Sequence, residues 1–408
     1  MIIDTKIALE KKLKEISEIL DREVENNKQI GVLSGITGIA LFNFYYSKYL
    51  DIDDHADKGV ELLNESVNRI NEGYQFPTFC TGIAGAAWVF DHLAEEDFME
   101  AENDELLSEL DEFLYAVMEN DMKTGNYDFL HAAVGYGYYF IKRLRNTQSD
   151  ELKKRYETFL SNFLDMLKDS ATEDPNGLKW ESTLDIETGL RGYNLSLSHG
   201  LSSIIIFLAK LMQFDALKEK TTPLLDGALS YLLSNEYKSE TRPVHFPSWV
   251  MLDEEEAKEG SSRLAWCYGD IGPGLALLHT SEALNREDLK EKALNILRFS
   301  AKRTQPDDTG VRDAGVCHGS YGNAQIFNRL YKKTGEEIFK NAASFWIDHG
   351  LETAIHEDGF AGYKQWRGKD EEWLPENNLL EGIAGIGLAI IDYLADFDTK
   401  WDECLMIS

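Results

Sequence analysis

Two short stretches decide how this chain folds: Trp266-Cys267-Tyr268-Gly269-Asp270-Ile271-Gly272 and, fifty residues later, Cys317-His318-Gly319-Ser320-Tyr321-Gly322. Each contains a cysteine, then a polar or aromatic residue, then two glycines three positions apart, followed by apolar residues at helical spacing. A glycine pair in front of an apolar helix indicates a sharp, closely packed turn. Because the pattern occurs twice, it indicates an internal repeat that extends over more of the chain.

The Gly-x-x-Gly turn recurs along the whole sequence. Clear copies lie at 35–38, 82–85, 269–272, 319–322 and 382–385. Two degenerate copies, at 132–135 and 200–203, have Ala132 and Ser203 in place of a glycine. Successive copies are 47 to 69 residues apart, which is enough for two helices and their connections.

Each turn separates two kinds of predicted helix. Apolar helices follow the turns, at 39–49, 86–93, 136–144, 204–212, 275–284, 324–331 and 386–394. Amphipathic helices precede them, at 6–25, 60–70, 105–118, 151–167, 223–233, 287–301 and 336–351. A helix that is apolar on most sides is buried, whereas one with a charged face lies at a surface.

Seven such hairpins predict an all-α fold with two concentric rings of helices. We expect an α/α toroid of seven helical hairpin repeats in which residues 1–408 form one domain. An open solenoid is the alternative, but no polar capping repeat marks its ends. The segments 169–194 and 237–263 lack helical periodicity and are predicted to be long loops that line a mouth or lid.

Composition argues against several classes of protein. The chain has 408 residues, 43% of them apolar, and a formal net charge of −31, which argues against a nucleic-acid-binding surface. Its start has no apolar core of a signal peptide, and no stretch approaches a membrane span. Four cysteines without close CxxC spacing make a disulfide framework implausible. We therefore expect a reduced, cytoplasmic protein in which thiols bind metal or catalyse.

One position in each repeat is polar although it precedes a buried helix. It is the residue immediately before the first small residue of the turn: Ser34, Thr81, His131, His199, Tyr268, His318 and Glu381. A hydrophobic core would not place polar side chains at all seven equivalent positions. The pattern predicts that the turns lie at one end of the ring and face a shared cavity.

Three residues in this zone have the chemistry of metal ligands. Cys267 and Cys317 belong to neighbouring repeats, and His318 is next to the second cysteine. Two thiolates and an imidazole favour zinc, and three protein ligands with an open fourth position are typical of a catalytic site. The alternative is that both cysteines pack in the core and His318 is a hydrogen-bonded polar residue. Cys80 lies across the ring and is interpreted as a small buried residue, and Cys404, in the tail, as incidental.

Further candidates lie near the same turns. His199 is a possible acid or base, and Asp128, a carboxylate among apolar neighbours, could orient it or raise its pKa. Arg263, four residues before Cys267, could stabilise a developing oxyanion. Each also has a structural interpretation: an interior histidine, a turn residue and a surface arginine. His131 is the weakest candidate.

Taken together, these motifs resemble one family. The stretches 194–200 (Asn-Leu-Ser-Leu-Ser-His-Gly), 263–269 (Arg-Leu-Ala-Trp-Cys-Tyr-Gly) and 317–319 (Cys-His-Gly) each open a predicted inner helix. They resemble the lanthionine synthetase C-like family, the lanthipeptide cyclases, repeat for repeat along the chain. The combination of Trp-Cys-Tyr-Gly with Cys-His-Gly carries the resemblance, because Gly-x-x-Gly alone is not specific.

The resemblance implies an α/α toroid with one Zn²⁺ per chain. Such an enzyme closes thioether rings by adding a cysteine thiol to a dehydroalanine or dehydrobutyrine of a dehydrated precursor peptide. Matched by motif, the implied zinc ligands are Cys267, Cys317 and His318. The implied catalytic residues are His199 as acid/base, Asp128 beside it, and Arg263 and Tyr268 lining the site. The implied partners are the precursor peptide, a separate dehydratase and a transporter.

The match has two departures, and three alternatives stay open. Ala132 and Ser203 replace turn glycines beside the proposed acid/base residues, so Asp128 is aligned less securely than the cysteines. A relative of the family could add glutathione or another thiol to dehydro residues, and a zinc-stabilised scaffold could bind peptides without catalysis. A glycosidase would require a pair of carboxylates, such as Asp128 and Glu381, and would leave the cysteines idle.

Overall fold

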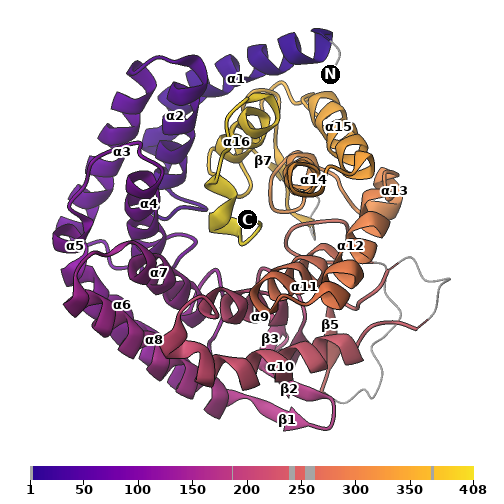
Figure 1. Cartoon of the computed structure of the whole chain (residues 1–408). Helices are drawn as coiled ribbons and strands as arrows, with labels where there is room; N and C mark the ends of the chain where they lie inside the picture. Colours follow the sequence, from indigo (N-terminus) through magenta and orange to yellow (C-terminus); the bar gives the residue numbers. More distant parts are fainter. Residues whose placement is uncertain (1–2, 186, 239–243, 253–261, 369–371) are drawn as a thin grey trace.

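The computed structural model describes residues 3–185, 187–238, 244–252, 262–368 and 372–408. Its helices form two concentric rings, as predicted (Figure 1). The outer ring contains α1 (Ile3–Glu23), α3 (Asp54–Asn71), α6 (Ser108–Lys123), α8 (Asp150–Ser170), α10 (Lys218–Ser234), α12 (Glu287–Ala301) and α15 (Glu337–Glu352). The inner ring contains α2 (Ile36–Leu50), α4 (Ile83–Glu95), α7 (Ala133–Asn146), α9 (Leu201–Leu211), α11 (Ile271–Leu284), α14 (Ser320–Thr334) and α16 (Ile383–Leu394). The all-α toroid expected from the repeats is therefore confirmed.

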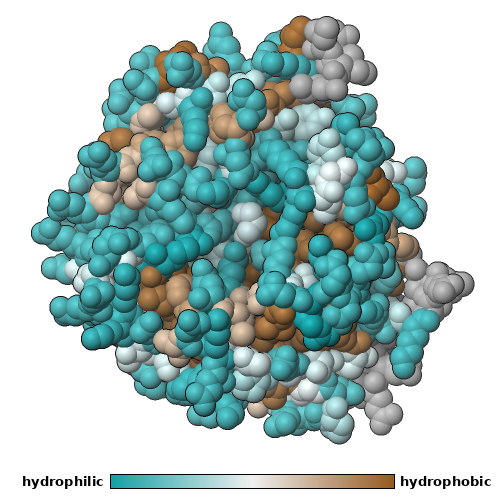
Figure 2. All heavy atoms as spheres, in the orientation of Figure 1, coloured by the Kyte–Doolittle hydropathy of each residue, from teal (hydrophilic) through white to brown (hydrophobic). Residues whose placement is uncertain are grey.

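Burial explains the two rings. In the inner helix α4, each residue from Ile83 to Leu93 is buried, because neighbouring inner helices and the outer ring surround it. The outer helix α3 buries only Gly59, Leu63 and Ser66 and exposes its charged side. The face of the molecule seen in Figure 2 is accordingly covered mainly by hydrophilic side chains. Among the described residues, no helix combines the length and apolar composition that a membrane crossing requires.

The ring is closed by its turns as well as by its helices. The first and last inner helices, α2 and α16, pack against each other. In addition, backbone hydrogen bonds connect six of the seven turns to the next turn. In each of them, the residue two positions before the turn donates its amide to the carbonyl of the equivalent residue in the next repeat. These bonds run from Leu33 to Cys80, Cys80 to Leu130, Ser198 to Cys267, Cys267 to Cys317, Cys317 to Leu380, and Leu380 back to Leu33, with N···O distances of 2.8 to 3.5 Å. An open solenoid has no such return, so this alternative is wrong.

One link of this backbone ring is missing. Leu130 and Ser198 both lie in the part of the chain that the structure describes, yet no hydrogen bond joins the amide of Leu130 to the carbonyl of Ser198. The gap falls between the third and fourth repeats, whose turns have Ala132 and Ser203 where the other repeats have glycine.

The turn glycines are required by a close approach of the backbone. An ideal Cβ at Gly385 would lie 1.8 Å from the carbonyl oxygen of Leu379, and one at Gly322 would lie 1.9 Å from that of Val316. No side chain fits at such distances, so the second glycine recurs. Because it lies inside the first helical turn, most inner helices begin about three residues earlier than predicted.

Two other sequence predictions need correction. The helix expected from Pro223 begins at Lys218, because Pro223 lies inside α10, where it removes one backbone hydrogen bond without ending the helix. The two predicted loops contain β1 (Thr172–Asp174), β2 (Gly177–Lys179), β3 (Glu181–Asp185), β4 (Leu190–Asn194) and β5 (Trp249–Met251). Strands β3, β4 and β5 pair antiparallel, and a further hairpin joins β6 (Gln365–Trp366) to β7 (Trp373–Leu374). These strands have two to five residues, too few to show a clear alternation in the sequence.

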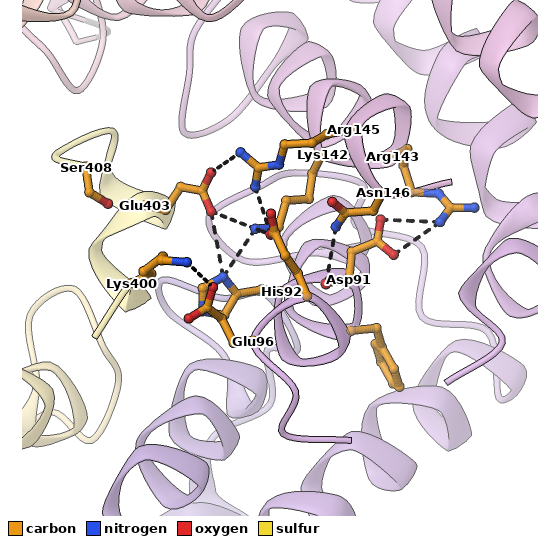
Figure 3. Close-up of polar contacts among 12 residues, drawn as sticks. Asp91, His92, Glu96, Lys142, Arg143, Arg145, Asn146, Lys400, Glu403 and Ser408 are labelled. Atoms are coloured by element: carbon orange, nitrogen blue, oxygen red, sulfur yellow. Dashed lines mark hydrogen bonds and ion pairs between the residues drawn. The ribbon is translucent and has the colours of Figure 1, made fainter. Parts of the chain in front are cut away.

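The C-terminal segment fills the middle of the ring (Figure 1). It includes the short helix η4 (Trp401–Leu405), whose side chains are buried. Its polar groups are bound by inner helices: Lys142 Nζ lies 2.6 Å and Arg145 Nη1 2.7 Å from the Glu403 carboxylate (Figure 3). The indole of Trp266, from the first motif, donates to the carbonyl of Leu405 at 2.8 Å. Cys404, for which the sequence suggested no role, is fully buried in this segment.

Candidate metal centre

Two neighbouring turns bring Cys267, Cys317 and His318 together. The backbone bond from the amide of Cys267 to the carbonyl of Cys317, 3.2 Å long, aligns the turns before α11 and α14. One ligand atom from each of the three side chains lies within 4.8 Å of the other two. A tetrahedral zinc site with bonds of about 2.0 to 2.3 Å requires ligand atoms roughly 3.5 to 3.8 Å apart, so this set fits such an ion.

The electrostatics of the two cysteines agree with this fit. The hydrogen bond from Cys317, together with His318, holds the pKa of Cys267 well below its ordinary value although burial opposes the charge. The hydrogen bond with Cys267 and burial in turn raise the pKa of Cys317 well above the usual range. Cys267 is thus the thiol that loses its proton first, and a bound metal ion would favour loss of the second proton, from Cys317.

Asp313 orients His318, a role that the sequence reasoning missed. The Asp313 carboxylate, 1% exposed, lies 3.0 Å from His318 Nε2. The same carboxylate accepts hydrogen bonds from the amides of Gly315 and Trp366. With Nε2 facing Asp313, Nδ1 is the ring nitrogen that is available to a metal ion. The charge of Asp313 outweighs the effect of burial and raises the pKa of His318 well above its ordinary value.

His199 and Asp128 form a second group, at the gap in the backbone ring. His199 Nδ1 lies 2.6 Å from Asp128 Oδ2, so a side-chain contact joins the two turns that no backbone bond connects. The other oxygen of Asp128 accepts the amide of His131 at 2.8 Å. The sequence hypothesis that Asp128 orients His199 therefore has the geometry it requires.

The pair is electrostatically matched. Burial disfavours the charged form of His199, but the hydrogen bond and the charge of Asp128 outweigh it and raise the pKa of His199. Burial also works against the Asp128 charge, yet the bond to His199 holds the pKa of Asp128 below its usual value. His199 is therefore held toward its protonated form, and because Nδ1 is bound to Asp128, Nε2 is the nitrogen free to act on a ligand.

Tyr268 and His131 flank His199. The ring of Tyr268 is 6.3 Å from that of His199 and 6.0 Å from that of Trp249 in β5, measured between centroids. The ring of His131 stacks at 6.0 Å on the other side. Trp249 is 45% exposed, which makes it an aromatic side chain beside the site that the sequence reasoning did not single out. Its signal was weak because β5 is only three residues long.

Arg263 is a half-buried residue close to the cysteines. Its positive charge contributes to the lowered pKa of Cys267, after the effects of Cys317 and His318. It also lines a cavity of about 630 Å³ together with Arg303, Arg312 and Trp366. It is thus not the isolated surface arginine of the alternative interpretation.

The other polar turn positions, Ser34, Thr81 and Glu381, are partly accessible to solvent, and the shared cavity expected from the repeat pattern stays a prediction. Ser34, Thr81 and Glu381 are half-buried between fully buried neighbours. Ser34 and Glu381 line a cavity of about 460 Å³. Cys80 is a buried thiol 3.2 Å from the hydroxyl of Ser34, and burial raises its pKa to about 12.

A second cluster with metal-ligand chemistry holds a lysine instead. His92, Glu95 and Glu403 also place ligand atoms within 4.8 Å of one another. However, the ammonium of Lys142 contacts all three side chains, so the position of a cation is already taken (Figure 3). This cluster fixes the C-terminal segment in the ring.

Known proteins share both the fold and the sequence pattern. The model of the family described as lanthionine synthetase C-like protein matches residues 27–406. The nisin biosynthesis protein NisC of Lactococcus lactis subsp. lactis is 25% identical over 362 residues, which cover 80% of this chain and 76% of NisC. The protein named glutathione S-transferase LANCL1 of Danio rerio is 22% identical over 362 residues, covering 86% and 82% of the two chains.

A solved structure confirms the architecture. The structure of nisin cyclase superposes with a TM-score of 0.72 at 19% identity and covers 98% of this chain and 97% of its own. The family match spans nearly the whole sequence, from the first turn to the C-terminal segment. The chain belongs to the lanthionine synthetase C-like family.

Proposed function

We propose that this protein is a zinc-dependent lanthipeptide cyclase, which forms (methyl)lanthionine thioether rings in a dehydrated precursor peptide. The observation that carries the proposal is the convergence of Cys267, Cys317 and His318 on one point, beside the Asp128–His199 pair. The similarity to NisC and to nisin cyclase supports a peptide as the substrate.

The thiol donor of the peptide would be activated at the metal centre. Cys267, Cys317 and His318 would hold Zn²⁺ through two sulfurs and one nitrogen. When bound, the ion lowers the pKa of a substrate thiol, so that the thiol is a thiolate at neutral pH. Asp313 keeps the His318 ring in the orientation this requires.

The chain's own side chains would complete the addition. The substrate thiolate attacks the β-carbon of a dehydroalanine or dehydrobutyrine, a C–S bond forms, and the alkene π electrons move toward the carbonyl as an enolate. The raised pKa of His199 favours its protonated form, which would deliver a proton from Nε2 to the α-carbon while Asp128 holds the imidazole in place. Arg263 would stabilise the enolate oxygen, and Tyr268 would line the site beside His199. Nothing leaves in this reaction, so the peptide keeps its mass.

Partners and location follow from the same proposal. The substrate must be dehydrated first, so a separate dehydratase is expected to act before this protein, and a transporter after it. A reduced cytoplasm suits the free thiols of the centre. We also propose that residues 1–408 act as one domain, since the ring closes on itself through both helices and turns.

The test is ring closure in a synthetic peptide that contains one dehydroalanine and one cysteine. Because cyclisation does not change mass, the product is measured by loss of a thiol that N-ethylmaleimide can alkylate, against the rate without protein. We expect wild-type protein with zinc to close the ring and His199→Ala to be slower by a factor of about 10² to 10⁴. His55→Ala, on the outer helix α3, is the matched control and should keep the wild-type rate.

The same assay separates the alternatives. With glutathione and a peptide that lacks cysteine, a glutathione-adding enzyme would give an adduct of higher mass, which we do not expect. A scaffold without catalysis would leave the uncatalysed rate unchanged with either peptide. Equal rates for wild type and His199→Ala would remove His199 from the mechanism.

A further inference from the structure

A cavity beside the metal centre is lined by three arginines. It measures about 630 Å³, and its wall includes Arg263, Arg303, Arg312 and the aromatic rings of Phe299 and Trp366. Asp308 is the one acidic residue among the described residues that line it. This concentration of positive charge is unusual in a chain with a net charge of −31.

None of the three arginines forms an ion pair with a carboxylate among the described residues, and the charges of Asp270 and Asp308 act on Arg303 only from beyond ion-pair distance. Of the ten other arginines that the structure describes, nine form an ion pair with an aspartate or glutamate. Around this cavity, by contrast, Arg303 donates only to the backbone carbonyls of Ser262 and Asp308. Among the described residues, an ion pair is thus the rule for arginines elsewhere in the molecule and is not formed at this cavity.

Arg303 also keeps a donor without an acceptor. Its Nη1 atom is buried and has no hydrogen-bond partner. A buried, unsatisfied guanidinium nitrogen costs free energy unless a ligand satisfies it. The guanidinium carbon of Arg312 lies over the ring of Trp366, 4.9 Å from its centroid, so a cation–π contact holds this side chain at the cavity wall.

Residues of the cavity wall are connected to the metal ligands in two ways. Arg263 lies on its wall and acts electrostatically on Cys267. On the opposite side, the backbone amide of Trp366 binds Asp313, which contacts His318. A peptide whose cysteine reached the centre would therefore have nearby residues over this cavity.

From these observations we infer that the cavity binds a carboxylate of the substrate peptide and holds the peptide beside the metal centre. Guanidinium groups bind carboxylates through paired N–H···O bonds, and Trp366 and Phe299 would pack on the aliphatic part of the bound residue. The carboxylate would come from an aspartate or glutamate side chain or from the end of a peptide. The inference rests on the proposed function only for the identity of this peptide.

Direct binding tests the cavity without catalysis. The probes are tetraglutamate amide and tetraglutamine amide with an uncharged fluorophore, and tetraglutamine with a free C-terminal carboxylate. We expect fluorescence anisotropy to show binding of a carboxylate probe, weaker at high salt, and little binding of the tetraglutamine amide. The two carboxylate probes distinguish a side chain from a chain end.

Variants then locate the binding. Arg312→Gln removes a guanidinium whose described contact is the stack on Trp366, and should weaken binding by about tenfold or more. Arg312→Lys should restore part of it. Lys302→Gln, an exposed neighbour of Arg303 that does not line the cavity, loses the same charge and should bind as wild type does.

The outcomes separate this inference from the proposed function. Equal affinity for the acidic and neutral amides, or equal losses in Arg312→Gln and Lys302→Gln, would overturn the inference even if the protein closes rings. Arg312-dependent binding of a carboxylate probe by a protein that closes no ring would support the cavity and contradict the cyclase.

Discussion

At the scale of single residues, Asp128 acts on the site through His199. Its carboxylate makes a 2.6 Å contact with Nδ1 and raises the pKa of His199. In Asp128→Asn this charge is lost, so the pKa of His199 should fall and less of the imidazole should be protonated at neutral pH. An NMR pH titration of the histidine ring, assigned with His199→Gln, measures the shift, and an unchanged titration would contradict the account.

The sign of the pH dependence follows from the direction of the two shifts. A raised pKa of His199 means that the pair stabilises the fold fully below the unfolded value near 6.5 and that this stabilisation is lost as the pH rises through the folded value. The lowered pKa of Asp128 means a loss as the pH falls through its folded value. The rate of ring closure should likewise fall on the alkaline side, and at a lower pH in Asp128→Asn.

Asp313 should affect the affinity for the metal ion and not the protonation of His199. Asp313→Asn removes the charge that faces His318 Nε2 but keeps an acceptor for the amide of Trp366. Loss of such an outer partner weakens metal binding by about 10- to 100-fold. Zinc competition with a chromogenic chelator measures this, with the exposed Asp308→Asn as control. Equal affinities in the two variants would show that Asp313 only supports the loop.

The sequence could predict contacts between residues that occupy equivalent positions of neighbouring repeats. Cys267, Cys317 and His318 stand at equivalent positions of adjacent turns, so their meeting follows from the repeat itself. Asp313 and Trp249 were not found, because nothing in the chain order sets one aspartate among 72 acidic residues, or one tryptophan in a short strand, apart from the others. Their roles depend on contacts with segments far apart in sequence.

At the scale of the elements, the turn glycines set the packing of the inner helices. Gly385→Ala would place a Cβ 1.8 Å from the carbonyl oxygen of Leu379, so the backbone must shift. We expect a loss of about 3 kcal/mol in the free energy of unfolding. Gly272→Ala is the matched control, because its nearest contact would be 3.1 Å from the amide of Leu197, and it should lose less than about 1 kcal/mol. Denaturant unfolding followed by circular dichroism compares them, and equal losses would contradict the close-approach explanation.

Helices were easier to predict than strands for a physical reason. An inner helix such as α4 has eleven consecutive buried residues, a signal that survives any local irregularity. The strands β3, β4 and β5 gain their order from pairing with one another, and β4 pairs with β5 although α9 and α10 separate the two strands in the chain. Their ends were therefore not marked in the sequence, and the segments read as loops.

At the scale of the whole molecule, the C-terminal segment ties the inner ring together. Glu403 is buried between Lys142 and Arg145, whose charges hold its pKa well below the ordinary value although burial opposes this (Figure 3). Glu403→Gln would leave the buried Lys142 and the half-buried Arg145 with Glu95 as their shared carboxylate among the described residues, which should cost about 1 to 3 kcal/mol. Thermal unfolding should show this loss at pH 7. The loss should shrink only in strong acid, where the wild-type carboxyl is itself protonated.

The control for this prediction is an exposed carboxylate. Glu357→Gln, at an exposed position before β6, should leave the unfolding temperature nearly unchanged. If Glu403→Gln unfolded at the same temperature as Glu357→Gln, the ion pairs of the C-terminal segment would not contribute to the stability of the ring.

The proposed function depends on a zinc site that two neighbouring repeats assemble. The most direct measurement is metal content by inductively coupled plasma mass spectrometry on wild type, Cys317→Ala and Cys80→Ala. Cys80 occupies the same repeat position as Cys317 but lies outside the cluster, so it controls for loss of a buried thiol. We expect about one zinc per chain in wild type and in Cys80→Ala, and none in folded Cys317→Ala. A folded wild type that holds no zinc and takes up none on titration, or equal zinc in all three proteins, would contradict it.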